Sequence, residues 1–194
     1  MEYLAEKLTR YVISKGTISE EDYRVYKYGL QTGMEMILCM AISSLIAIGL
    51  KSFFEFLFLV LVFFPLRAYY GGVHLKHFLS CFVCSCTVIT SVLILAKKCV
   101  LAGGISFAII IFLLLGSYRL ASFIMKKQKI DEEEYGFLKK QQRRIAIIVG
   151  ILALIFLTFH VSTLEILLMI TVFVVFSSLV LESIIVGMGL EVSG

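Results

Sequence analysis

The chain has 194 residues, of which 60% are hydrophobic and 16% are charged, and its formal net charge is +4. Soluble globular domains hold roughly 45–50% apolar and about 25% charged residues, and a chain this short cannot bury so large an apolar excess in its own core. The composition therefore excludes a soluble domain, and it also excludes a disordered chain and a nucleic-acid-binding domain, which both need more charge.

Residues 1–29 form the most polar part of the N-terminal half, with five basic and five acidic side chains. They contain no apolar run of the kind found in a cleavable signal peptide. Apolar residues near helical spacing predict a short amphipathic helix. This helix either lies on the membrane surface or packs as a cap on the rest of the protein. The residues that carry the pattern are Tyr3, Leu4, Leu8, Tyr11 and Val12.

Six apolar segments follow within residues 30–190, which we expect to form an all-α membrane domain. About 20 apolar residues cross the hydrocarbon core as a helix, and continuous apolar runs exclude the alternating pattern of a β-barrel. Three runs of 20 residues lack any charge, and three others are shorter. The runs are 77–96, 99–118 and 145–164, and then 36–50, 56–66 and 166–181. We expect a polytopic bundle of about six transmembrane helices, or four full spans plus two partial or re-entrant ones, with 56–66 as the re-entrant candidate.

The basic residues are distributed unevenly between the two sides of a six-helix arrangement. Residues 1–29, the loop 67–77 and the loop 126–144 together hold 14 of the 18 Lys and Arg residues, and these regions share one side. The other side holds only Lys51, Lys97 and Lys98. Because cytoplasmic loops carry an excess of Lys and Arg, this pattern predicts that both termini are cytoplasmic.

The segment 65–81 concentrates most of the reactive side chains. It contains Arg67, the pair Gly71 and Gly72, two histidines and Cys81. Polar residues at membrane depth are costly and are therefore functional candidates. A histidine can remove the proton of a thiol, and the thiolate can then attack a carbonyl carbon. The segment therefore predicts a nucleophile–base pair at the cytoplasmic face.

Spacing alone leaves two histidines as candidates for the base. His77 and Cys81 are four residues apart, so on one helix they share a face. His74 and Cys81 are seven apart, or about 10.5 Å along a helix axis, which is too far for a hydrogen bond. His74 can reach Cys81 only if the chain turns between them, and the glycine pair favours such a turn. Geometry alone slightly favours His77.

Two less specific interpretations of the same residues stay open at this point. Cysteine is a common small residue in buried helices, and this explains the remaining four cysteines. A metal site is a weaker alternative, because no carboxylate lies nearby in the sequence; we expect no metal and no cofactor. The other cysteines are Cys39, Cys84, Cys86 and Cys99, and the metal alternative would use His74, His77, Cys81 and Cys84.

The arrangement of Arg67, Gly72-Val73-His74 and Cys81 resembles the accessory gene regulator B (AgrB) family of Gram-positive quorum-sensing systems. Gly29-Leu30-Gln31 is similar to a second landmark of that family. The resemblance covers essentially the whole chain. It implies a cysteine endopeptidase of the cell membrane that cleaves an AgrD-like precursor peptide and releases a cyclic thiolactone or lactone. It also implies a homodimer, with its active site at the cytoplasmic face.

The resemblance assigns Cys81 as nucleophile and His74 as base, which replaces the geometric preference for His77. Family members often have a proline and a serine between the pair, and this chain lacks that proline. Arg67 would stabilise an oxyanion or hold peptide carboxylates, and Gln31 would orient His74. The remaining candidates are Gly71 and Gly72, which would let backbone approach the substrate, and His77, which would assist or lie on the surface.

A small non-enzymatic transporter or peptide exporter is the alternative function. A transporter would spread polar residues over several helices at mid-membrane depth. This sequence instead gathers its reactive groups at one edge, which favours the enzyme.

Overall fold

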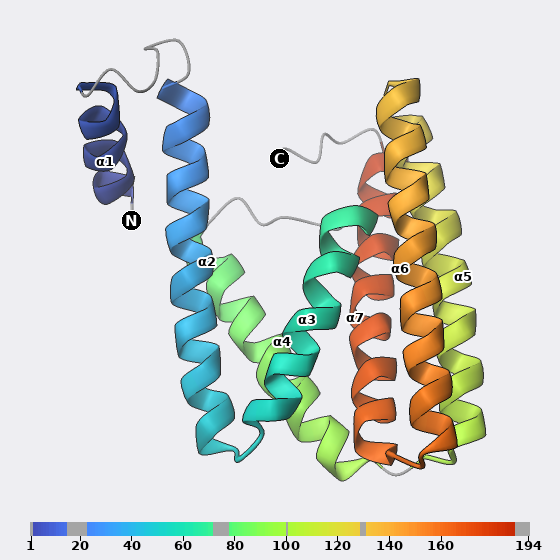
Figure 1. Ribbon diagram of the computed structural model, residues 1–194. Helices are drawn as coiled ribbons and strands as arrows, with labels where there is room; N and C mark the ends of the chain where they lie inside the picture. The colour runs from blue at the N-terminus through green and yellow to red at the C-terminus, as the bar shows by residue number, and fades with distance from the viewer. Residues whose placement is uncertain (1, 15–22, 72–77, 100, 129–130, 189–194) are drawn as a thin grey trace.

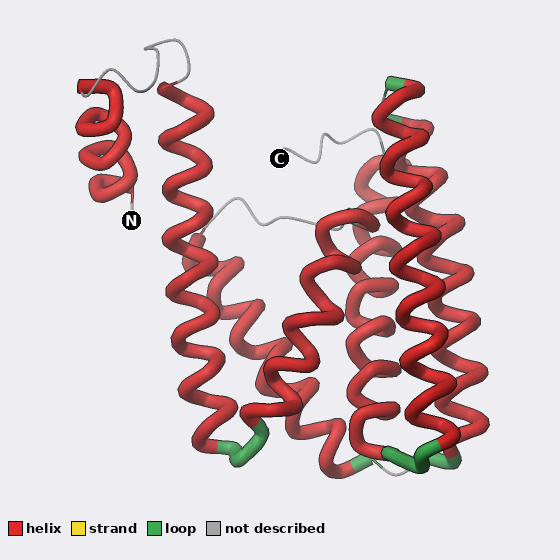
Figure 2. The backbone as a smooth tube through the Cα atoms, in the orientation of Figure 1, coloured by secondary structure: helices red, strands yellow, loops and turns green. Residues whose placement is uncertain are grey.

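The protein is described by a computed structural model that covers residues 2–14, 23–71, 78–99, 101–128 and 131–188. All the regular secondary structure in these residues is helical (Figures 1 and 2). The helices are α1 (Glu2–Ser14), α2 (Tyr23–Gly49), α3 (Phe53–Tyr70), α4 (Phe78–Lys98), α5 (Gly103–Lys127), α6 (Glu132–Thr158) and α7 (Ser162–Gly187).

Six of these helices, α2 to α7, pack together in the part of the chain that the sequence predicts to lie in the membrane. Among the described residues, α2, α3, α5, α6 and α7 are long and apolar enough to cross a bilayer. Helix α4 has 21 residues, and its only charged side chains are Lys97 and Lys98 at its end. The predicted re-entrant segment 56–66 lies inside α3, a single helix of 18 residues. The all-α polytopic fold is therefore confirmed, and the partial-span alternative for 56–66 is not what the structure has.

Successive helices of the membrane domain run in alternating directions (Figure 1). The start of α2, the end of α3 and the start of α4 point to the same end of the bundle, together with the α5–α6 turn and the end of α7. We call this the basic end, because the 14 basic residues counted above belong to its connections and flanking helix turns. The opposite end carries Lys51, Lys97 and Lys98. The connections that the sequence predicts to share one side therefore lie at one end of the bundle.

Helix α7 is the centre of the bundle, because it contacts α3, α4, α5 and α6. One buried cluster joins α7 to α3, α5 and α6 and includes Leu168, Val172 and Leu179. A second cluster joins α7 to α2, α3 and α4 through Ile166 and Leu167. Figure 1 shows α5, α6 and α7 side by side, with α2 at the far edge. The position of α7 places any polar side chain on its inner faces inside the protein.

Lysine side chains satisfy carbonyl groups where helices end. The Lys97 ammonium donates to the carbonyls of Leu50 and Lys51, both at 3.0 Å, just after α2. At the basic end, the Lys127 ammonium donates to the carbonyl of Gly187, the last residue of α7, at 3.0 Å. The last carbonyls of a helix have no partner inside it, and a cation there also interacts favourably with the helix dipole. These hydrogen bonds give the carbonyl groups at the C-terminal ends of α2 and α7 a partner.

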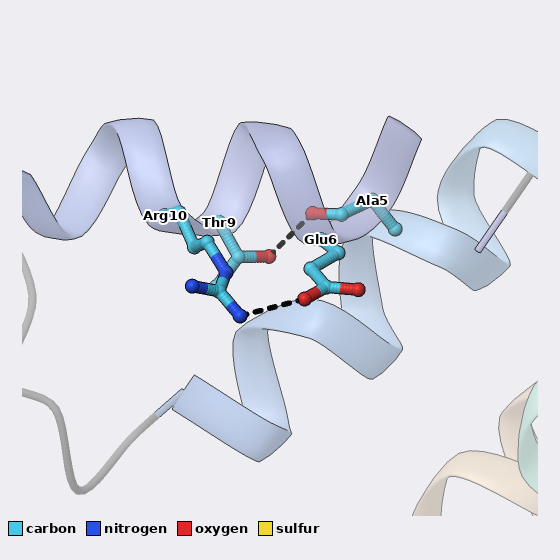
Figure 3. Close-up of polar contacts among 4 residues, drawn as sticks. All are labelled: Ala5, Glu6, Thr9 and Arg10. Carbon is cyan, nitrogen blue, oxygen red and sulfur yellow. Dashed lines mark hydrogen bonds and ion pairs between the residues drawn. The ribbon is translucent and has the colours of Figure 1, made fainter. Parts of the chain in front are cut away.

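Helix α1 packs against α2 with one face and leaves its aromatic face outward. Ala5 and Thr9 are fully buried, whereas Tyr3 and Tyr11 are exposed. Figure 3 shows the internal contacts of α1, in which the Thr9 hydroxyl donates to the Ala5 carbonyl at 2.7 Å. The ion pair between Arg10 and Glu6, 2.8 Å long, also raises the pKa of the guanidinium. The helix itself is as expected, and its position on a membrane surface stays a prediction.

The α5–α7 contact depends on a small residue, and this generates a test. A Cβ placed on Gly116 would lie 2.8 Å from Cε2 of Phe176. Close approach at small residues is a general feature of membrane helix packing. We expect Gly116→Ala to lower the free energy of unfolding by about 1–3 kcal/mol, the usual cost of overpacking. Thermal unfolding in detergent measures the change.

Gly104→Ala is the matched control on the same helix, since a Cβ on Gly104 meets nothing within 4 Å. Alanine also favours a helix over glycine, so this variant should unfold at the wild-type temperature or slightly above it. Equal midpoints for the two variants would contradict the packing described here.

Candidate functional site

The structure describes only part of the predicted site. Arg67 lies in the last turn of α3, and Gly71 follows that helix directly. Gly72, His74 and His77 lie outside the described residues. Cys81 belongs to the first turn of α4, where only its backbone is described. The structure therefore brings the end of α3 and the start of α4 to the basic end, as predicted. The choice between the two histidines is not tested.

The end of α3 is held against α7 by polar side chains. The Arg67 guanidinium donates from Nη1 to the Ser178 hydroxyl at 2.9 Å. Glu182 lies one helical turn after Ser178 on α7, and Gly71 lies one turn after Arg67 on α3. An ideal Cβ on Gly71 would be 3.3 Å from Oε2 of Glu182. The end of α3 thus faces two neighbouring turns of α7. Ser178 lies opposite Arg67, and Glu182 lies opposite Gly71.

Gly71 has the conformation that glycine permits and other residues avoid. Its φ angle is 93°, in the left-handed half of the backbone map. Its amide donates to the Arg67 carbonyl at 3.1 Å, which closes the last turn of α3. A side chain here would meet both the unfavourable φ and the Glu182 carboxylate. Gly71 therefore ends α3 and starts the segment that carries Gly72, His74 and His77.

Helix α6 fixes the end of α3 from another side through Gln142. This side chain is fully buried, and its Nε2 donates to the Tyr69 carbonyl at 2.8 Å. In return, the Tyr70 hydroxyl donates to the backbone carbonyl of Gln142 at 3.0 Å. Tyr69 is in the last turn of α3, where carbonyls lack helical partners. The two reciprocal bonds, which we call the α3–α6 clasp, set the position of the chain just before Gly71.

The clasp also shows how far the end of α3 lies from the start of α6, measured along the axis of α6. Gln142 is ten residues beyond the start of α6, so α3 ends about 15 Å below that start along the helix axis. Helix α6 has 27 residues, or about 40 Å, which exceeds the roughly 30 Å hydrocarbon core. Its polar first turns therefore extend beyond the hydrocarbon. If the excess length of α6 lies at its polar start, we expect the end of α3 near the boundary between hydrocarbon and water.

Helix α6 carries basic side chains on both sides of the clasp. The Lys139 ammonium lies 3.6 Å from the centroid of the Tyr118 ring on α5, and it also donates to the Ser122 hydroxyl. This cation–π contact attaches α6 to α5. Lys140, Arg143 and Arg144 are exposed. These exposed cations can attract anionic groups, either of lipids or of a peptide.

Other predicted residues have simpler surroundings. The Gln31 amide on α2 donates to Oε1 of Glu35 at 3.0 Å, a contact within one helix. Cys39, Cys86 and Cys99 are half-buried and Cys84 is exposed. Within the described ranges, no three His, Cys, Asp or Glu side chains form a metal-binding group. His74 and His77 fall outside those ranges and the side chain of Cys81 is not described, so the metal alternative is untested.

Sequence analysis missed the polar partners from α6 and α7. Glu182 and Gln142 are buried, and Ser178 is half-buried at the α3–α7 contact. A sequence signal existed for Glu182, because it directly follows 16 residues without any charge. A lone carboxylate at the end of such a run is expected to face protein. Gln142 had no comparable signal, since it lies in a polar stretch.

Comparison with known proteins identifies the family. The family model described as accessory gene regulator B (AgrB) matches residues 5–186, nearly the whole chain. The chain therefore belongs to the AgrB family, whose role is in quorum-sensing peptide processing and whose partner is an AgrD-type precursor peptide. No match was found among curated proteins or among solved structures.

The α3–α6 clasp generates a test with a neighbouring control. We expect Gln142→Ala to lower the free energy of unfolding by about 1–3 kcal/mol, because it removes a fully buried side chain and leaves the carbonyl of the half-buried Tyr69 without this donor. Gln141→Ala changes a partly exposed neighbour and should stay within about 0.5 kcal/mol of wild type. Thermal unfolding of both variants in the same detergent measures this. A Gln142→Ala protein as stable as Gln141→Ala would refute the clasp.

Proposed function

Given that the chain is a member of the AgrB family, we propose that it is a membrane cysteine endopeptidase. It cleaves the C-terminal tail from an AgrD-like precursor and cyclises the remaining peptide. The observation that supports this most is the family match over residues 5–186, together with the motif Arg67, Gly72-Val73-His74 and Cys81. The start of α4, which carries Cys81, and the end of α3 lie at the same basic end of the bundle.

In the first step, His74 accepts the thiol proton of Cys81. The Cys81 thiolate then attacks the carbonyl carbon at the C-terminal end of the signal sequence. When the tetrahedral intermediate collapses, the peptide C–N bond breaks and His74 returns the proton to the departing amine. The tail leaves, and the signal sequence stays bound to Cys81 as a thioester.

In the second step, the bound peptide closes on itself. A thiol or hydroxyl of the peptide attacks the thioester carbonyl, and the C–S bond to Cys81 breaks. The proton of the attacking group passes through His74 to the Cys81 sulfur. The product is a ring closed by a thioester or an ester, and the Cys81 thiol is regenerated. No cofactor and no metal take part in this sequence.

Five further residues are proposed to support the reaction. Arg67 offers a rigid set of donors for the oxyanion or for peptide carboxylates. Gly71 and Gly72 allow peptide backbone to approach. Gln31 orients the base from α2, and His77 assists it or contacts solvent.

The proposal places the enzyme in the cell membrane of a Gram-positive bacterium as a homodimer. With 14 basic residues at the basic end against three at the opposite end, that end faces the cytoplasm by the positive-inside rule. Both termini and the active site are then cytoplasmic, where thiols stay reduced. A reduced compartment keeps Cys81 available as a nucleophile.

Cleavage of a precursor peptide by the protein in proteoliposomes tests this function. Cys81→Ala removes the nucleophile and should abolish tail release. His74→Ala should slow it by about 10²–10⁴-fold, the usual contribution of a general base. Mass spectrometry of the released tail and of the ring measures both changes.

Two control variants separate the assigned residues from their neighbours. Cys84→Ala changes an exposed thiol on the same helix, and it should cleave at the wild-type rate. His77→Ala should retain cleavage if His74 is the base. Tail release that persists in the Cys81→Ala protein would rule out the mechanism.

A further inference from the structure

Exposed cations gather on the outer surface of α5 and α6. Arg119 on α5 and Lys140, Arg143 and Arg144 on α6 are all exposed, and we call them the outer basic cluster. Within the described part of the chain, none of the four forms an ion pair. Figure 1 shows α5 and α6 at the edge of the bundle opposite α2, and they pack on α3, α7 and each other. The cluster therefore faces the surroundings of the protein rather than its centre.

A contact between α5 and α6 places the cations of the two helices at one level. The Lys139 ammonium lies 3.6 Å from the centroid of the Tyr118 ring. Arg119 directly follows Tyr118 in α5, and Lys140 directly follows Lys139 in α6. Arg119 and Lys140 therefore lie within about one helical turn of each other along the bundle axis. Arg143 shares a face of α6 with Lys140, because three residues separate them.

Exposed apolar side chains continue both helix faces toward the opposite end of the bundle. On α5, Leu115 precedes Arg119 by one turn and is 63% exposed. On α6, Ile147 and Ile151 follow Arg143 by one and two turns and are 55% and 52% exposed. Residues at these spacings share a helix face. The outer surface of α5 and α6 thus changes from basic to apolar in the same direction on both helices.

Two uncharged runs of the sequence place this change at the edge of the hydrocarbon. The run 99–118 ends directly before Arg119, and the run 145–164 begins directly after Arg144. Each run has 20 residues, about the length that crosses the hydrocarbon core as a helix. Because α5 and α6 run in opposite directions, both runs meet the cluster at the same end of the bundle. We therefore expect the outer basic cluster at the level of the lipid headgroups.

Cations next to an exposed apolar surface match the structure of an anionic phospholipid, which joins a phosphate to acyl chains in the same order. A guanidinium can bind phosphate through two parallel hydrogen bonds. Lys and Arg near the cytoplasmic face of a membrane are attracted to anionic lipids. An acidic peptide would match the charges of the cluster, but it would not cover the apolar side chains beside them. The combined surface therefore favours a lipid.

We propose that the outer surface of α5 and α6 binds an anionic phospholipid. The lipid phosphate lies between Arg119 and Lys140, with Arg143 one turn closer to the hydrocarbon. An acyl chain covers Leu115 and Ile147. This site is separate from the proposed peptidase reaction, so its test requires no precursor peptide and does not depend on cleavage.

Native mass spectrometry of the full-length protein in detergent measures the binding of added lipids. Phosphatidylglycerol is the anionic probe, and phosphatidylcholine with the same acyl chains is the neutral one. The test variant combines Arg119→Gln with Lys140→Gln. We expect it to bind phosphatidylglycerol about 10–30-fold more weakly than wild type does, the effect of losing two basic residues beside an anionic headgroup. Its affinity for phosphatidylcholine should equal that of wild type.

The matched control combines Lys7→Gln with Arg24→Gln. Lys7 on α1 and Arg24 on α2 are also exposed and belong to the basic end, so the control loses the same two residue types and the same charge. It should bind phosphatidylglycerol as wild type does. Because the substituted side chains are exposed, both variants should unfold at the wild-type temperature in lipid-free detergent, and thermal unfolding checks this.

Three results would overturn the proposal. Wild type that binds the two lipids equally would show no preference for an anionic headgroup. An equal loss of phosphatidylglycerol affinity in the control and the test variant would show attraction by the whole basic end rather than by a site. A polyglutamate peptide that binds wild type but not the test variant, while phosphatidylglycerol binds both equally, would assign the cluster to an acidic peptide instead.

Discussion

The structure depends on one constraint, which is that the backbone polar groups of a chain inside a membrane must find hydrogen-bond partners within the protein. Helices satisfy the backbone along their length and leave the problem at their ends. Lys97 provides the partner after α2, and Lys127 provides it at the end of α7. At the end of α3, Gln142 on α6 provides the partner for the Tyr69 carbonyl. The basic end is therefore where the helices have to be precisely arranged with respect to one another.

This constraint explains why a reactive site can be placed at the end of α3. The clasp with Gln142 holds Tyr69 and Tyr70, and the Glu182 carboxylate occupies the space that a side chain at Gly71 would need. The proposed base His74 follows three residues later, and the proposed nucleophile is in the first turn of α4. Support comes from α6 and α7, which lie far away in the sequence. A site built in this way is held by the central part of the bundle and stays near the membrane boundary.

The sequence predicted the architecture well because long apolar runs have few alternatives in lipid. The helical segments and the grouping of the basic connections followed from charge-free runs and from Lys and Arg alone, whereas five of the six expected spans are candidates by length and composition among the described residues. The partners Gln142 and Ser178 could not be predicted, because hydrogen bonds between distant helices depend on packing that has no local pattern. Glu182 was visible as an isolated charge, but only its contact with Gly71 connects it to the site. His74 and the Cys81 side chain lie outside the described residues, so their pairing stays a prediction.

The most direct test of the central claim is the intact mass of the protein after a brief reaction with precursor peptide and an acid quench. A Cys81 nucleophile predicts an adduct whose mass equals that of the peptide without its tail. Fragmentation should locate the adduct at Cys81, and neutral hydroxylamine should release it as expected of a thioester. Tail release without any covalent adduct, or an adduct at Cys39, Cys84, Cys86 or Cys99, would contradict the account.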